Sequence, residues 1–70
     1  MFYWFKKGDE FARYESRTTG PGKFELVVTG PDGGESVEHF TDANELNARQ
    51  VALEQELAAS GWTGPYGWNV

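Results

Sequence analysis

Turn-forming residues interrupt β-prone runs at regular intervals in residues 2–40, which read FYWFKKGDEFARYESRTTGPGKFELVVTGPDGGESVEHF. The turns are Gly8-Asp9, Gly20-Pro21-Gly22 and the glycine-rich run at 30–34. The segments between them, 2–7, 11–18, 24–29 and 35–40, are rich in aromatic and β-branched residues, which favour strands. Because short loops join antiparallel neighbours, this stretch predicts a meander of four antiparallel strands.

The loop lengths also predict which side chains share a face, because a slip of one residue would turn every side chain to the opposite side. A two-residue Gly8-Asp9 loop sets Tyr3 opposite Tyr14. Three-residue loops at 20–22 and 31–33 then set Phe24 opposite Phe40. The resulting inward face is apolar and contains Tyr3, Phe5, Tyr14, Phe24, Leu26, Val28 and Phe40. Glu38 is the exception, since the same register places its carboxylate on this apolar face.

The opposite face of the sheet is mixed in character. It contains Phe2, Trp4, Arg13, Glu15, Arg17, Glu25, Val27, Val37 and His39. Trp4 lies opposite Arg13 in this register, which favours a cation–π contact. His39 lies opposite Glu25, and we interpret that pair as a structural contact across two strands. We therefore expect any recognition surface to lie on this second face.

A single helix is predicted over residues 42–60, which lack glycine and proline and are rich in alanine, leucine and glutamate. Asp42 and Glu45 form a capping-box pattern at its start. An apolar stripe of Leu46, Leu53 and Leu57 should pack on the sheet. The sequence thus predicts an α+β fold of order ββββα, with one C-terminal helix packed on one face of a four-stranded meander.

The last ten residues, 61–70, form an aromatic tail that contains Trp62, Tyr66 and Trp68. Gly61 is placed to end the helix in the left-handed conformation, so that Trp62 folds back against Leu57. We expect the tail to be too short for another regular element and too aromatic to remain in solvent. The whole chain, 1–70, is predicted to be one domain.

Composition restricts the classes of function. The 70-residue chain has no cysteine and one histidine, so disulfides and thiolate or imidazole metal clusters are excluded. Small domains bury a thin core, and self-association is one remaining source of stability, which makes a homodimer worth considering. With no signal-peptide pattern, no membrane-length apolar run and a mean hydropathy of -0.61, a cytoplasmic protein with no membrane partner is expected.

Charge is unevenly distributed along the chain. Residues 1–23 carry five basic and three acidic side chains, a balance of +2, whereas residues 24–70 carry one basic and eight acidic side chains, a balance of -7. The resulting net charge of -5 repels nucleic acid and anionic lipid. Any nucleic-acid role would have to reside on the first two strands.

Residues that carry out catalysis are not recognisable in the sequence. There is no nucleophile beside an oriented base, and the glycine-rich turns lead into strands and contain Pro21 and Pro31, which lack the N–H donors of a phosphate cradle. We therefore predict a protein that is not an enzyme and that has no catalytic residue, no metal site and no cofactor.

The order of four strands and a helix over residues 2–60 resembles the half-repeat of the PUR and Whirly folds, which bind single-stranded nucleic acid. The resemblance rests on topology, and the acidic balance differs from the basic sheet of that group. The ending from Glu56-Leu57 through Gly61-Trp62-Thr63-Gly64-Pro65 is similar to that of short uncharacterised bacterial proteins of four-strand-plus-helix type. This second resemblance does not indicate any particular activity.

Two functional hypotheses remain at this stage. The first is a small interaction module that contacts another protein, or a second copy of itself, through the mixed sheet face and the tail; its candidate binding residues are Phe2, Trp4, Arg13, Arg17, Val27, His39, Trp62, Tyr66 and Trp68. The alternative is a single-stranded nucleic-acid binder that combines Trp4 with Arg13, Arg17, Lys6, Lys7 and Lys23. A third reading is that the tail itself covers the mixed face.

Overall fold

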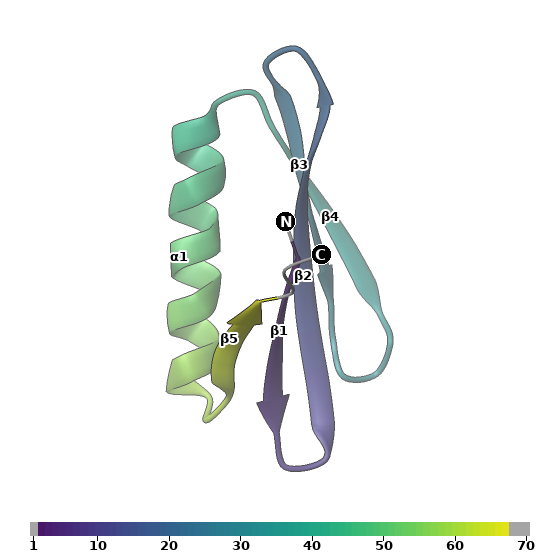
Figure 1. Ribbon diagram of the computed structural model, residues 1–70, viewed down its shortest axis with the longest axis vertical. Helices are drawn as coiled ribbons and strands as arrows, with labels where there is room; N and C mark the ends of the chain where they lie inside the picture. The colour runs from purple at the N-terminus through teal and green to yellow at the C-terminus, as the bar shows by residue number, and fades with distance from the viewer. Residues whose placement is uncertain (1, 68–70) are drawn as a thin grey trace.

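The computed structural model describes residues 2–67, which form a five-stranded antiparallel sheet with one helix across one face (Figure 1). The elements in chain order are β1 (Phe2–Lys7), β2 (Glu10–Gly20), β3 (Lys23–Thr29), β4 (Glu35–Phe40), α1 (Ala43–Ala59) and β5 (Thr63–Gly67). The strands lie in the order β4-β3-β2-β1-β5. The α+β class and the antiparallel meander are confirmed, whereas the predicted count of four strands was one too few.

The predicted register of the meander is confirmed. Tyr3 pairs with Tyr14 across β1 and β2, and Phe24 pairs with Phe40 across β3 and β4. At the third turn the Gly33 amide donates to the Gly30 carbonyl at 3.0 Å, and Gly33 has a φ of +85°, which glycine adopts without strain. The type I turn with a left-handed glycine therefore forms as the Pro31-Asp32-Gly33 sequence predicts.

The second turn differs in detail from the prediction. Gly20 pairs with Lys23, so the loop consists of two residues, Pro21 and Gly22, instead of three. The β2–β3 pairing shifts between Thr18 and Gly20. This irregularity absorbs one residue, and for that reason the side chains beyond it still face the sides that a three-residue loop would give them.

Apolar side chains from the sheet and the helix meet in one core. Its buried members are Phe5, Tyr14 and Leu26 from the sheet and Leu53 from α1. A ring of half-buried side chains packs against them: Tyr3, Val28, Phe40, Leu46, Leu57 and Trp62. The leucine stripe of the helix therefore lies on the apolar sheet face, as its spacing predicts.

Both ends of α1 are capped by the residues that the sequence indicates. The Asp42 carboxylate accepts a hydrogen bond from the Asn44 amide at 2.8 Å, which satisfies one free N–H at the start of the helix. At the other end Gly61 has a φ of +91°, and the Trp62 amide donates to the Leu57 carbonyl at 3.0 Å. This 6→1 bond is the Schellman motif, and it turns the chain back toward the sheet.

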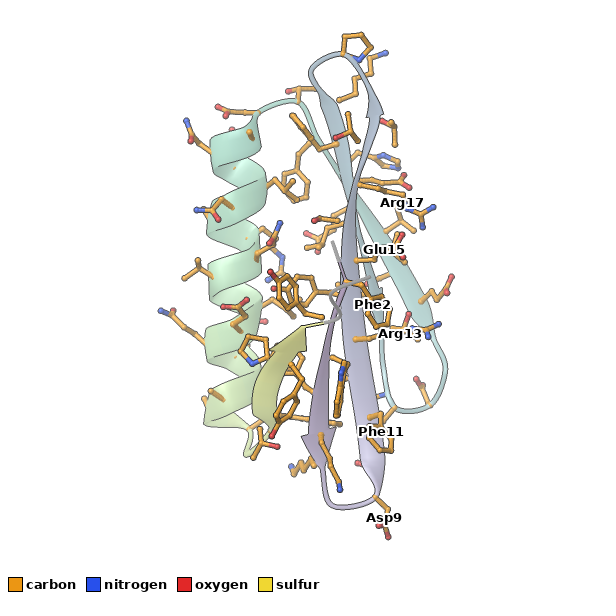
Figure 2. All side chains as sticks on the ribbon, in the orientation of Figure 1. Phe2, Asp9, Phe11, Arg13, Glu15 and Arg17 are labelled. Carbon is orange, nitrogen blue, oxygen red and sulfur yellow. The ribbon has the colours of Figure 1, made fainter. Side chains whose placement is uncertain are left out.

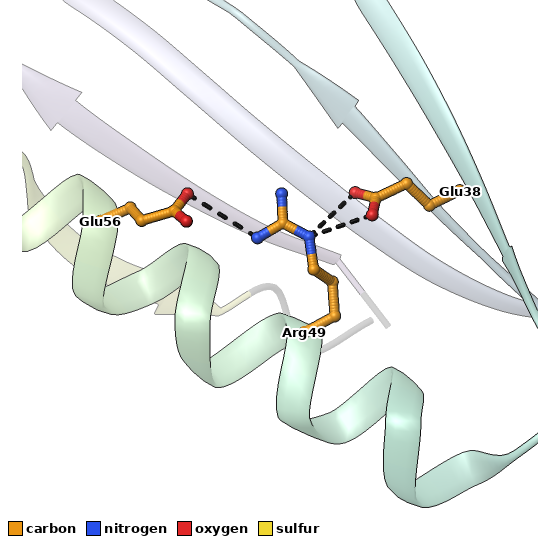
Figure 3. A network of polar contacts seen from close by, with 3 residues as sticks. All are labelled: Glu38, Arg49 and Glu56. Carbon is orange, nitrogen blue, oxygen red and sulfur yellow. Dashed lines mark hydrogen bonds and ion pairs between the residues drawn. The ribbon is translucent and has the colours of Figure 1, made fainter.

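The charged side chain on the apolar face, Glu38, is neutralised by the helix. The Nε of Arg49 lies 3.0 Å and 3.1 Å from the two carboxylate oxygens of Glu38, and its Nη1 lies 3.7 Å from Glu56 (Figure 3). The hydrogen bond to Glu38 raises the pKa of Arg49. Glu38 thus sits at the margin of the core as part of an ion pair, and the predicted register does not have to change.

The expectation that residues 61–70 form no regular element was wrong for Thr63–Gly67. This segment pairs with β1 as β5, with Trp4 opposite Tyr66 and an irregularity between Trp4 and Lys6. Gly64 permits the approach, because its φ is +136° and an added Cβ would lie 2.8 Å from Cδ1 of Phe5. The tail therefore adds an edge strand to the sheet beside β1.

Candidate functional site

The face of the sheet that α1 leaves uncovered is the candidate site, and we call it the outer face. Figure 2 shows Phe2, Phe11, Arg13, Glu15 and Arg17 along this face, on the side of the sheet away from α1. Residues that lie directly opposite each other on adjacent strands project to the same side, and Trp4 lies opposite Arg13. The prediction that Trp4 and its arginine neighbours lie on the side of the sheet away from the helix is therefore confirmed.

One end of the outer face carries four aromatic rings, Phe2, Trp4, Phe11 and Tyr66, which we call the aromatic cluster. The ring centroids of Trp4 and Tyr66 are 4.5 Å apart, and those of Trp4 and Phe11 are 5.8 Å apart. Both separations lie in the range of favourable ring contacts. Phe11 is 55% exposed and Tyr66 is 43% exposed, so the cluster presents a large apolar surface to solvent.

A hollow of about 470 Å³ lies between this cluster and the β3–β4 turn. Its walls are formed by Phe2, Trp4 and Phe11 on one side and by Thr29, Gly30, Pro31 and Gly33 on the other, with Ala12 and Arg13 between them. The hollow is thus lined by three aromatic rings, the ring of Pro31 and the guanidinium of Arg13. Many recognition sites have this composition, in which apolar walls surround few polar groups.

Arg13 is the cation of the hollow, but its ring partner differs from the prediction. The register does place it opposite Trp4. Its guanidinium carbon lies over the ring of Phe2, 5.7 Å from the centroid, and the cation–π contact that the structure shows is therefore with Phe2. The ring of Trp4 contacts the rings of Tyr66 and Phe11.

The other end of the outer face is charged. Arg17 Nε lies 2.9 Å from Glu25 and 3.4 Å from Glu15, and His39 Nδ1 lies 3.9 Å from a Glu25 oxygen. The predicted cross-strand contact of His39 with Glu25 is thus present. Arg17 is engaged by two carboxylates and contributes less free positive charge to this face than the sequence alone suggests.

The remaining predicted site residues lie in different places. Val27 is on the outer face but only 8% exposed, because neighbouring side chains cover it. Trp62 packs against the core cluster, on the helix side of the sheet. Trp68 lies outside the described residues. The tail therefore brings Tyr66 to the aromatic cluster, while Trp62 serves the core.

Two parts of the site were missed from the sequence. Phe11 has the same parity as Arg13 in β2, and counting outward from the Gly8-Asp9 turn would have placed it beside Trp4. The second part is the wall formed by the Pro31 turn, which depends on how the β3–β4 hairpin bends toward Arg13. No feature of the sequence indicates this bend.

No protein family, curated protein or solved structure matches this chain. The site therefore has to be interpreted from its own geometry. Within residues 2–67 no three His, Asp or Glu side chains are grouped so as to hold a metal ion. The helix of this part of the chain is also too short and too polar to cross a bilayer.

Proposed function

We propose that this chain is a small non-catalytic interaction module that binds another protein through the aromatic cluster and the hollow beside it. The observation that carries the proposal is the exposure of Phe11 and Tyr66 beside a hollow that contains Arg13. Aromatic residues and arginine are the types most enriched where protein interfaces concentrate their binding energy. A partner side chain that is apolar or aromatic fits the hollow best.

The charge of the outer face supports a protein partner over a nucleic acid. Glu15, Glu25 and Glu35 lie beside the arginines, and two of these carboxylates pair with Arg17. Phosphate binding depends on unpaired lysine and arginine side chains, which release counterions. The partner that suits this surface is therefore a folded protein that presents an apolar side chain to the hollow and a carboxylate to Arg13. A polyanion such as a nucleic acid suits it less well.

Affinity capture with a matched pair of variants tests the proposal. Phe11→Ser and Val51→Ser each remove an exposed apolar side chain, 55% and 44% exposed, from opposite sides of the molecule. Native chain and Val51→Ser should retain the same partner, and Phe11→Ser should weaken its binding at least about tenfold, which corresponds to about 1.4 kcal/mol.

Circular dichroism of both variants checks that the fold is intact. A partner that binds native chain and folded Phe11→Ser with equal affinity would refute the assignment of the aromatic cluster as the contact surface.

A further inference from the structure

The two edges of the sheet are protected to different degrees. β5 carries Pro65, and its pairing with β1 is interrupted by an irregularity between Trp4 and Lys6, which are features that discourage a further strand from pairing. β4 pairs with β3 without interruption over all six of its residues, Glu35–Phe40. It contains no proline and no lysine. β4 is therefore the edge that can accept another strand.

The backbone of β4 shows which groups are free to accept that strand. The Gly30 amide donates to the Gly34 carbonyl at 2.9 Å, so these two residues form a bonded pair of the β3–β4 ladder. Bonded pairs alternate along an antiparallel ladder. By this alternation Ser36, Glu38 and Phe40 bond to β3, and the backbone groups of Glu35, Val37 and His39 point away from the sheet.

We propose that β4 pairs with β4 of a second copy of this chain, in antiparallel register with Val37 opposite Val37 of the copy. In this register Glu35 faces His39 of the copy, and His39 faces Glu35. Every outward backbone group of the three residues then enters a bonded pair. The two sheets become one continuous ten-stranded sheet around a two-fold axis.

Charge and strand overlap together select this register among those that the backbone permits. A shift of one pair in one direction would set Glu38 directly opposite Glu38 of the copy, and like charges opposite one another destabilise a sheet. The same shift in the other direction would set His39 opposite Gly33, which lies outside β4, so that two bonded pairs would remain instead of three. The proposed register instead sets Glu38 beside Ser36, and the Glu38 charge is already held by Arg49 at 3.0 Å. It also sets the carboxylate of Glu35 beside the exposed imidazole of His39, which is favourable when the imidazole is protonated.

Exposure of the strand is consistent with a second copy as the occupant. Val37 is 48% exposed, and β4 touches only β3 and α1 among the described elements. Pairing would cover Val37 with its own counterpart. Because the two-fold axis stands perpendicular to the sheet, both helices would lie on one side and both aromatic clusters on the other. The dimer would present two hollows on a single surface.

Cysteine cross-linking tests the register directly, because the chain has no cysteine of its own. Val37→Cys places two thiols at directly opposed positions, where the Cα separation of about 5.5 Å suits a disulfide. Val51→Cys is the matched control, since Val51 is similarly exposed at 44% but lies on the helix. Under mild oxidation Val37→Cys should form a disulfide dimer at least about tenfold faster than Val51→Cys. Equal rates would overturn the proposal.

Sedimentation equilibrium provides the second measurement, on chains without cysteine. Native chain should show a reversible monomer–dimer equilibrium, and Val37→Lys should weaken it at least about tenfold by placing two ammonium groups against each other. Gln55→Lys adds the same single positive charge at an exposed position of α1, outside β4, and should leave the equilibrium unchanged.

A native chain that is monomeric at all concentrations would overturn the proposal. So would a dimer that Val37→Lys leaves intact but Phe11→Ser dissolves, because that result would place the contact on the outer face. Neither result alters the test of the outer face as a surface for another protein, which rests on different residues.

Discussion

The hydroxyl of Tyr14 donates a hydrogen bond of 2.5 Å to the carboxylate of Glu54, and this contact joins the centre of the sheet to the helix. Tyr14 is 1% exposed and is one of the largest side chains in the core. Its phenol oxygen is buried, and a buried polar group is costly unless it has a partner. Glu54 supplies that partner from the margin of α1, so the hydrogen bond helps to fix the helix over β2.

The environment of Tyr14 predicts a loss of stability in alkali. Burial, followed by the hydrogen bond and charge of Glu54, raises the pKa of the Tyr14 hydroxyl above its ordinary value of about 10. Below pH of about 10 the Tyr14 hydroxyl is protonated in both the folded and the unfolded chain, and its full contribution to the free energy of unfolding is present. Above this pH the unfolded chain loses the proton first, so the free energy of unfolding falls as pH rises.

Tyr14→Phe removes this titration and should make the alkaline loss of stability shallower by about 1 kcal/mol per pH unit above pH of about 10. Urea unfolding at several pH values measures it. Tyr66→Phe controls for the loss of a tyrosine that is 43% exposed and should follow the native curve. A Tyr14→Phe profile parallel to the native profile would contradict the assignment.

The arrangement of the meander could be predicted because its turns fix parity. Once Gly8-Asp9 forms a two-residue loop, Tyr3 must face Tyr14, and each later turn carries the same alternation onward. The extra residue at Thr19 did not harm the prediction, since the irregularity there restored the pairing of Thr18 with Phe24. Helix limits were equally accessible, because Asp42 and Gly61 have the chemistry of the two caps.

Features that depend on side-chain conformation or on distant contacts could not be predicted. The segment of β5 has low strand propensity, because two of its five residues are glycine and one is proline. It forms a strand because Gly64 allows a close approach to Phe5, a contact that the sequence does not indicate. Arg13 could reach either Trp4 or Phe2 from its position, and only packing of the rings decides between them. The partner of Glu38 depends on how α1 is rotated over the sheet, which brings Arg49 to it.

The Glu38–Arg49 pair predicts a coupled effect of two substitutions. Arg49→Met leaves a carboxylate beside the apolar face and should lower the free energy of unfolding by about 1 kcal/mol. The side chains are 31% and 38% exposed, so solvent limits the effect. Glu38→Gln combined with Arg49→Met should cost less than the two single changes added together. Thermal or urea unfolding of the four chains measures the coupling, and strict additivity would contradict it.

Gly64 predicts a strong local constraint on β5. Gly64→Ala should lower the free energy of unfolding by about 1–3 kcal/mol, because the residue has a φ of +136° and its new methyl group would meet Phe5 and the Trp4 carbonyl. Gly20→Ala is the matched control, since Gly20 does not have a positive φ and an added Cβ would lie 3.9 Å from the Lys23 side chain. Similar stability of the two variants would show that β5 does not need glycine at this position.

The paired state of Arg17 predicts weak or absent binding of single-stranded nucleic acid. Addition of an unstructured oligonucleotide at low salt should leave the tryptophan fluorescence unchanged, because Glu15 and Glu25 hold Arg17 and the chain as a whole carries a charge of -5. Replacing both carboxylates, as Glu15→Gln with Glu25→Gln, frees the guanidinium and should produce quenching that salt reverses. Salt-reversible quenching of the native chain would instead favour the nucleic-acid alternative over the protein-binding proposal, since stacking on Trp4 would then occur despite the acidic surroundings.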